Sequence, residues 1–227
     1  MLLSVTQHIL RLGAVLAFCA LAAVACGAPD EEAKLRPLPE ERRELRPGEY
    51  RTDDFEPAFS FRVGEGWTTE PPEMSEALLL TRGPETEGLG FANVQEVFVY
   101  KPTKTSSQTI VEAPEDMVGW FQEHPQLRTS EPERVEVGGI EGARFDAVVG
   151  ELPRDYFGEC GTGCVDLFRV GGAYPFSLWE KERARFIVLE EVEGETVTVG
   201  FFSPAAEFDE HAPEAQKVID TVEWRGG

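Results

Sequence analysis

Phe59-Ser60-Phe61-Arg62-Val63-Gly64-Glu65-Gly66-Trp67 opens the part of the chain in which the sequence indicates β-structure. Apolar and polar residues alternate from Phe59 to Val63, which is the pattern of a strand with one buried face. Gly64-Glu65-Gly66 then supplies a turn, because glycine adopts backbone conformations that other residues avoid. We therefore predict a strand, a turn and the start of a second strand at Trp67.

Further strand-like runs follow along the chain, separated by turn residues. They are Ala77 to Thr81, Phe91 to Tyr100, Glu133 to Val137, Ile140 to Val149, Val165 to Val170, Ala184 to Glu191, Thr196 to Phe202 and Val222 to Trp224. Pro114-Glu115-Asp116 predicts a helix start, because proline has no N–H to lose there and acidic side chains favour the helix dipole. Ser203-Pro204 and Pro213 predict two more helix starts. These elements predict an α+β fold, a largely antiparallel sheet layered by two or three helices.

Two stretches resemble PsbP-like domains. One is the strand, turn and Trp of Phe59 to Trp67, and the other is the strand, loop, helix and terminal strand of Val197 to Trp224. The resemblance covers Tyr50 to Trp224 and implies a PsbP-like α+β domain. Because members of this fold act mainly as adaptors and binding proteins, it implies binding rather than catalysis. Small lipoproteins of high-GC Gram-positive bacteria carry similar domains.

The N-terminal segment predicts export. Leu12 to Ala25 is an uncharged run that, as a helix rising about 1.5 Å per residue, is too short for a hydrocarbon core of about 30 Å. Such a run is typical of a signal peptide. Ala23-Val24-Ala25-Cys26-Gly27 then resembles the lipobox of bacterial lipoproteins, which implies cleavage before Cys26 and acylation of its thiol. The alternative is ordinary secretion with cleavage at Ala23-Val24-Ala25.

We therefore predict three parts of the chain: a signal peptide at 1–25, the lipidated Cys26 with a flexible charged tether at 26–48, and a single extracytoplasmic domain at 49–227. The tether is rich in proline and charge and has few apolar residues, so it cannot offset the entropy of ordering. Membrane lipid is the expected partner of Cys26, and the expected location is the extracytoplasmic face of the cell membrane.

The charge balance excludes some partners. The 227 residues include 42 acidic and 21 basic ones, which gives a formal net charge of −21, and the mature chain is more acidic still because Arg11 leaves with the signal peptide. No nucleic-acid partner is expected, since phosphate binding needs clustered Lys and Arg. Adsorption to anionic lipid by charge is equally disfavoured. We expect removal of the lipid, and not high salt, to release the protein from the membrane.

Cys160 and Cys164 predict a disulfide. They stand as Cys-Gly-Thr-Gly-Cys and are the two cysteines that remain once Cys19 leaves with the signal peptide and Cys26 takes lipid. Nearby cysteines in an extracytoplasmic domain are expected to be oxidised. The alternative is a redox or metal site, but a redox pair is usually spaced more closely and placed at a helix start.

The sequence contains none of the common catalytic patterns. Outside the signal peptide the histidines are His124 and His211, and neither has partners at zinc spacing. His-Glu-x-x-His, Gly-x-Ser-x-Gly, Walker and dinucleotide motifs are also missing from the sequence. We therefore predict no metal, no cofactor and no enzymatic activity. The alternatives are an envelope enzyme with an unrecognised active site, either a hydrolase or a thiol oxidoreductase, and a purely structural envelope component.

Tyr174-Pro175-Phe176-Ser177-Leu178-Trp179 is the strongest candidate for a contact surface. Its Gly and Pro neighbours make it look like a loop, and exposed aromatic residues mark contact sites. Tyr174, Phe176, Leu178 and Trp179 are the candidate contacts with a small ligand or an envelope protein. The alternative is that the segment covers an open sheet face. The leading hypothesis is a membrane-anchored, non-catalytic binding or interaction module.

Overall fold

The computed structural model describes residues 35–83, 87–99, 109–154, 156–170 and 174–225. The chain divides into two compact units, Met1–Glu32 and Ala33–Gly227, and all described residues belong to the second. The predicted signal peptide and Cys26 lie outside the described residues. Within those residues, neither helix has the length and apolar character needed to cross a bilayer.

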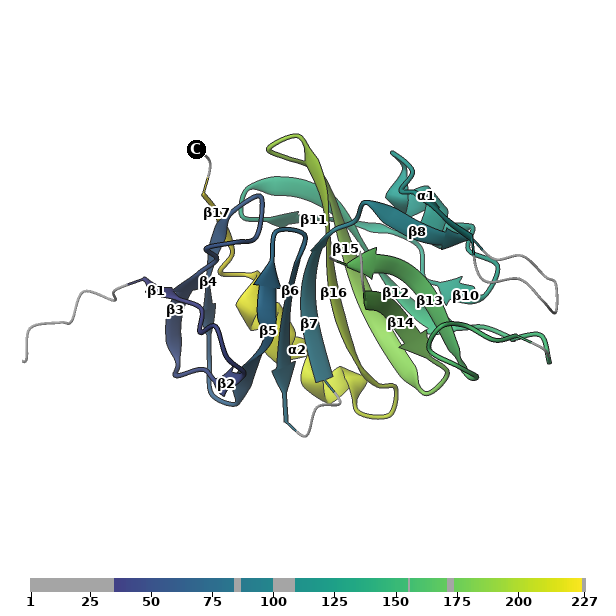
Figure 1. Cartoon of the computed structure of the whole chain (residues 1–227), viewed down its shortest axis with the longest axis horizontal. Helices are drawn as coiled ribbons and strands as arrows, with labels where there is room; N and C mark the ends of the chain where they lie inside the picture. The colour runs from purple at the N-terminus through teal and green to yellow at the C-terminus, as the bar shows by residue number, and fades with distance from the viewer. Residues whose placement is uncertain (1–34, 84–86, 100–108, 155, 171–173, 226–227) are drawn as a thin grey trace, which may run out of the picture. The chain divides into compact units, whose positions relative to one another are not determined.

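A nine-stranded antiparallel sheet, here called the large sheet, forms the centre of the domain (Figure 1). Its order is β10-β12-β15-β16-β7-β6-β5-β2, and β11 pairs with β12. The strands are β2 (Arg43–Glu44), β5 (Trp67–Met74), β6 (Ala77–Arg82), β7 (Glu87–Asn93), β10 (Leu127–Thr129), β11 (Glu133–Val137), β12 (Ile140–Val149), β15 (Glu182–Val192) and β16 (Glu195–Pro204).

Two four-stranded sheets accompany it. The N-terminal sheet has the order β1-β3-β4-β17, from β1 (Arg36–Pro37), β3 (Gly48–Arg51), β4 (Phe59–Val63) and β17 (Glu223–Trp224). The hairpin sheet has the order β14-β13-β8-β9, from β8 (Glu96–Val99), β9 (Thr109–Glu112), β13 (Cys164–Val170) and β14 (Tyr174–Trp179). The described helices are α1 (Met117–Gln122) and α2 (Phe208–Ile219).

Side chains of the large sheet alternate between its two faces, and each face packs against a different layer. On β16, Val197, Val199 and Phe201 enter a core shared with the N-terminal sheet and α2. Figure 1 shows α2 behind the strands of the large sheet. The residues between these three on β16 face the opposite way. That second face packs against the hairpin sheet and α1, with Phe186 of β15 4.6 Å from the ring of Phe121 in α1.

The predicted helix-layered α+β architecture is wrong. Strands make up 55% and helices 10% of the described residues. Ser203-Pro204 continues β16 instead of opening a helix, Pro213 lies inside the single helix α2, and Tyr174 to Trp179 forms β14. The hairpin sheet therefore covers much of the second face, where the prediction placed helices.

The strands predicted from clear apolar–polar alternation and from glycine turns are present in the structure. Phe59 to Val63 is β4 with the predicted bounds, and Glu133 to Val137 pairs with Ile140 to Val149. The turn between them has positive φ at both Gly138 (58°) and Gly139 (82°), which explains the glycine pair. The predicted run Phe91 to Tyr100 is instead shared by β7 and β8, which lie in different sheets.

The folded domain begins earlier than predicted, so the flexible tether at 26–48 needs correction from Leu35 onward. Arg36–Pro37 pairs with β3, and β2 pairs with β5. Leu38 and Leu45, which are sparse in a charged segment, are buried in the core at 9% and 2% exposure. Sparse leucines suffice here because they enter a core that the rest of the domain supplies.

Candidate functional site

A pocket of about 390 Å³ lies between the large sheet and the hairpin sheet. Its volume falls within the range of small-molecule sites, roughly 300 to 1,000 Å³. The wall is built mainly from β6, β7 and β16 on one side and from β13 and β14 on the other. The lining residues are Glu70, Met74, Ala77, Leu78, Leu79, Gly90, Phe91, Ala92, Phe168, Val170, Phe176, Thr198 and Gly200.

Two glycines that pair on neighbouring strands line the floor of the pocket. Gly90 of β7 pairs directly with Gly200 of β16, so no side chain rises from the sheet at either position. Across the gap, the ring of Phe176 stacks on Phe168 at 4.8 Å and meets Phe202 edge-on at 5.5 Å. These contacts hold Phe176 at the wall of the pocket, with its Cζ 3.8 Å from where a Cβ on Gly200 would lie.

Gly90 is not required by the backbone or by close packing. A Cβ placed there would meet nothing nearer than 3.8 Å. Gly88, one pleat away on the same face, is different, because a Cβ there would come within 2.1 Å of Cζ of Phe202. Gly88 therefore makes room for an aromatic ring, while Gly90 leaves open space. Glycine inside a strand often marks the close approach of a ligand or another backbone.

Two polar side chains line the pocket. Oε1 of Glu70 accepts a hydrogen bond from the Thr81 hydroxyl at 2.8 Å and pairs with Nε of Arg42, also at 2.8 Å. Thr198 is 1% exposed, and its hydroxyl has no hydrogen-bond partner among the described residues. The pocket thus combines an apolar wall, a carboxylate already paired with a cation, and a buried hydroxyl.

The predicted contact segment is divided between several environments. Tyr174 lies in β14, and its side chain is outside the described part of the chain. Phe176 lines the pocket. Leu178 is fully buried in the second core and so covers the sheet, which was the alternative. Trp179 is 45% exposed.

A second hollow of about 360 Å³ adjoins the pocket and shares Leu79 and Phe176 with it. Trp179, Cys160 and Glu182 also line this hollow. Burial raises the pKa of Glu182, and the hydrogen bond from the Trp179 N–H partly offsets that rise. The second hollow places the exposed Trp179 beside the cysteine loop.

The predicted disulfide between Cys160 and Cys164 is present. The buried carboxylate of Asp166 holds its loop, because it accepts hydrogen bonds from the Cys160 N–H at 3.3 Å and from the Ser177 hydroxyl at 2.6 Å. The loop is therefore tied to both strands of the β13–β14 hairpin. The structural function predicted for the two cysteines stays a prediction.

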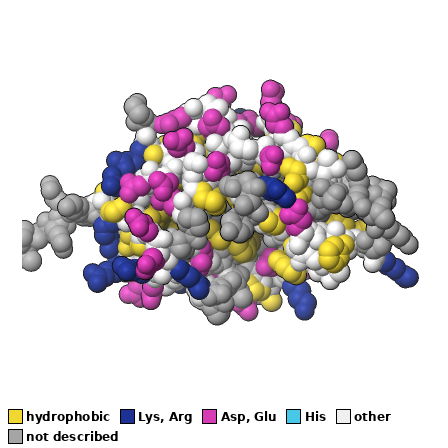
Figure 2. Space-filling view, viewed as in Figure 1, with side chains coloured by type: hydrophobic (Ala, Val, Ile, Leu, Met, Phe, Trp, Pro, Cys, Tyr) yellow, Lys and Arg dark blue, Asp and Glu magenta, His cyan; other side chains and the backbone are white. Residues whose placement is uncertain are grey.

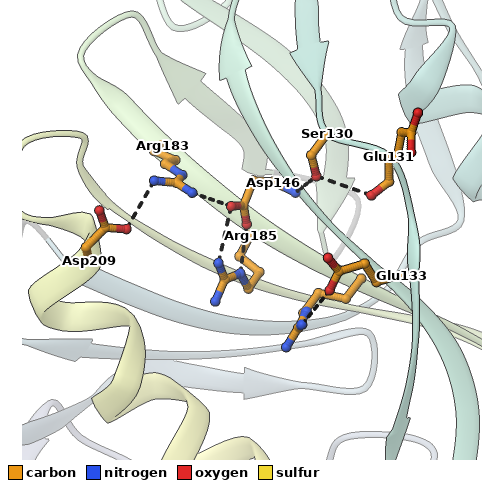
Figure 3. Close-up of polar contacts among 8 residues, drawn as sticks. Ser130, Glu131, Glu133, Asp146, Arg183, Arg185 and Asp209 are labelled. Atoms are coloured by element: carbon orange, nitrogen blue, oxygen red, sulfur yellow. Dashed lines mark hydrogen bonds and ion pairs between the residues drawn. The ribbon is translucent and has the colours of Figure 1, made fainter.

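A cluster of charged residues on β12, β15 and α2 is saturated by its own contacts (Figure 3). Asp146 accepts hydrogen bonds from Arg183 and Arg185, and Arg183 also pairs with Asp209 at 3.2 Å. Burial raises the pKa of Asp146, but the hydrogen bonds from Arg185 and Arg183 outweigh it and leave the pKa lowered. Both guanidinium groups also lie over the ring of Phe208. The cluster fastens α2 to the large sheet.

The two histidines outside the signal peptide lie on different elements, His124 in the loop after α1 and His211 in α2, and no contact joins these two described residues. His124, just after α1, is buried and accepts a hydrogen bond from the Gln126 N–H; burial lowers its pKa to about 4. His211 of α2 lies 3.0 Å from Oε1 of Glu87. Across the described ranges, no group of three or more His, Cys, Asp or Glu side chains is placed to hold a metal ion.

The glycines and Thr198 were not among the predicted site residues. The signal that was available is Gly88-Leu89-Gly90, where small residues alternate with an apolar one inside a strand. The pairing of Gly90 with Gly200 depends on the register of strands that are far apart in the sequence. Sequence alone does not supply that register.

No family model matches the chain, and no curated protein matches it. Among solved structures, the chain is similar to the solution structure of cyanobacterial PsbP (CyanoP) from Synechocystis sp. PCC 6803. The TM-score is 0.42 at 10% sequence identity, over 80% of this chain and 95% of that chain. This neighbour belongs to the type of domain that the sequence resembles, but similarity at this level carries no argument about function.

Proposed function

We propose that this chain is a membrane-anchored, extracytoplasmic binding protein that holds a small apolar ligand in the pocket between the large sheet and the hairpin sheet. The pocket carries this proposal. Protein interiors are close-packed, and hollows of this size are few. Here the hollow lies against Gly90, where added volume would meet open space, so close packing of the protein does not account for it.

Binding without catalysis is the mode that the lining residues favour. Glu70 is the one titratable side chain among them, and the same oxygen of its carboxylate already contacts Thr81 and Arg42. Acid–base or nucleophilic chemistry needs a base or nucleophile placed at the reacting atom with a second group to activate it. The residues that line the pocket offer no such pair.

The anchor part of the proposal rests on the resemblance of Ala23 to Gly27 to a lipobox. Because the described fold begins by Leu35, the chain from Cys26 to Leu35 spans at most about 30 Å when fully extended. Acylation at Cys26 would therefore keep the domain close to the bilayer. This is a shorter connection than the tether expected from sequence.

The test uses the mature chain with Cys26→Ser, which removes the lipid and changes no described residue, and the neutral fluorophore N-phenyl-1-naphthylamine. We expect saturable binding of one fluorophore per chain. Gly90→Val should abolish it, because the added methyl groups enter the pocket. Gly64→Val is the matched control, since a Cβ at this exposed glycine meets nothing within 4 Å.

Loss of binding in Gly90→Val with a melting temperature no lower than that of the wild type, and normal binding in Gly64→Val, would support the proposal. Binding that does not saturate, or that is equal in the two variants, would contradict it. Turnover of a substrate by the purified chain in hydrolase or oxidoreductase assays would support the enzyme alternative instead.

A further inference from the structure

The hydroxyl of Thr198 lies on the pocket face of β16. Its direct neighbours across the ladder are Val188 of β15 and Ala92 of β7, and both are buried. The two residues on either side of it in the strand are Val197 and Val199. Val197 and Val199 point into the opposite core, and no described residue pairs with the Thr198 hydroxyl.

A buried hydroxyl without a partner is unfavourable for the free protein, because it has lost hydrogen bonds to water and gained none. Valine has nearly the same shape as threonine and would fill this position without that loss. Thr198 is also one of the residues that line the pocket. A polar atom of a bound molecule would therefore provide the hydrogen-bond partner that the Thr198 hydroxyl lacks among the described residues.

The other polar group of the pocket restricts the charge of that molecule. Glu70 is matched by Arg42, so the pocket wall offers neither an unmatched cation for an anionic ligand nor an unmatched anion for a cationic one. An ion moved from water into apolar surroundings without a counter-charge is strongly disfavoured. A neutral ligand avoids this loss.

We infer that the pocket takes a neutral amphiphile, a hydrocarbon body with a hydroxyl or carbonyl group that hydrogen-bonds to Thr198. This inference rests on the proposed function, since it specifies the ligand of the same pocket. The hydrocarbon body packs against Leu79, Phe176 and the open space over Gly90. The polar group meets the buried hydroxyl, which can both donate and accept.

The test compares four probes of equal chain length on the mature Cys26→Ser chain: 1-octanol, octane, octanoate and octylamine, each competing with N-phenyl-1-naphthylamine. We expect 1-octanol to compete best. Thr198→Val should weaken 1-octanol binding by roughly threefold to tenfold, the equivalent of one hydrogen bond, and leave octane binding unchanged. Thr198→Ser keeps the hydroxyl and should retain most of the affinity for 1-octanol.

The possible results separate this inference from the proposed function. If octane and 1-octanol compete equally, or Thr198→Val binds 1-octanol as the wild type does, the pocket binds apolar ligands but the inference is wrong. If octanoate or octylamine competes best, the neutral ligand class is wrong. If no probe binds and Gly90→Val changes nothing, the proposed function itself fails. Thr198→Val should fold at least as stably as the wild type, because it removes an unpaired hydroxyl.

Discussion

Alanine at Gly88 and alanine at Gly90 should change stability in opposite directions, although the two residues lie on the same face of β7. At Gly88 the new Cβ would lie 2.1 Å from Cζ and 2.4 Å from Cε1 of Phe202, which sits directly opposite in the ladder. The ring must move, and it packs edge-on against Phe176. Overpacking of this type costs about 1–3 kcal/mol of unfolding free energy.

At Gly90 the same methyl group has space. Its nearest neighbours would be the Leu78 carbonyl oxygen and Cδ1 of Leu79, both at 3.8 Å, which is ordinary van der Waals contact. Gly90 also has no positive φ. Alanine therefore restricts the unfolded chain without straining the folded one, and we expect a gain of about 0.4–1 kcal/mol.

Urea denaturation followed by tryptophan fluorescence and by circular dichroism would measure both values. The unfolding free energies of the two variants should differ by about 1.4–4 kcal/mol, with Gly88→Ala less stable and Gly90→Ala more stable than the wild type. Equal effects at the two positions, or a destabilised Gly90→Ala, would mean that the space over Gly90 is not open. The pocket, and the function proposed for it, would then lose their basis.

Three further predictions follow from the charged groups and from the N-terminus. Asp146→Asn should lower the unfolding free energy measured in urea by about 1–3 kcal/mol, because Arg183 and Arg185 lose their carboxylate partner. In the wild type this stabilisation is present above the unfolded pKa of Asp, near 3.9, and is lost as the pH falls through the lowered folded pKa. His124 has a folded pKa of about 4 and an unfolded pKa near 6.5, so the unfolded chain binds the proton first as the pH falls. The unfolding free energy should therefore fall by at most about 3 kcal/mol between about pH 6.5 and pH 4. His124→Gln should weaken this dependence of stability on pH. Cys26→Ser should release the protein from membranes, whereas release of the wild type by high salt alone would contradict lipid anchoring.

Sequence patterns located the strands well because strand alternation is local. Phe59 to Val63 and the hairpin around Gly138-Gly139 were predictable from alternation and turn residues alone. Which elements cover the faces of the large sheet could not be predicted from local patterns. Pro175 made the aromatic segment look like a loop, yet it lies in β14, which is an edge strand of the hairpin sheet, and an edge strand tolerates a residue without an N–H.

Only part of the pocket could be predicted from the sequence. Phe176 belongs to the segment that stood out as a candidate contact, because aromatic residues near glycine and proline are conspicuous. Gly90, Gly200 and Thr198 did not stand out, since each is an ordinary residue in a strand. Their importance comes from register: β7 and β16 are separated by about half of the chain and meet with their two glycines side by side.

The acidic surface and the apolar pocket both affect how a ligand would reach the protein. Figure 2 shows carboxylate side chains spread over much of the visible face, interspersed with hydrophobic ones. Such a surface repels anions and an anionic bilayer, but this repulsion decays over a Debye length of about 8 Å at physiological ionic strength. With Cys26 acylated as proposed, a connection of up to about 30 Å would allow the domain to stand beyond that distance while it stays near the membrane. A neutral amphiphile concentrates in lipid and is indifferent to the charge of the protein, so an anchor that keeps the pocket beside the bilayer would supply this ligand better than electrostatic attraction would.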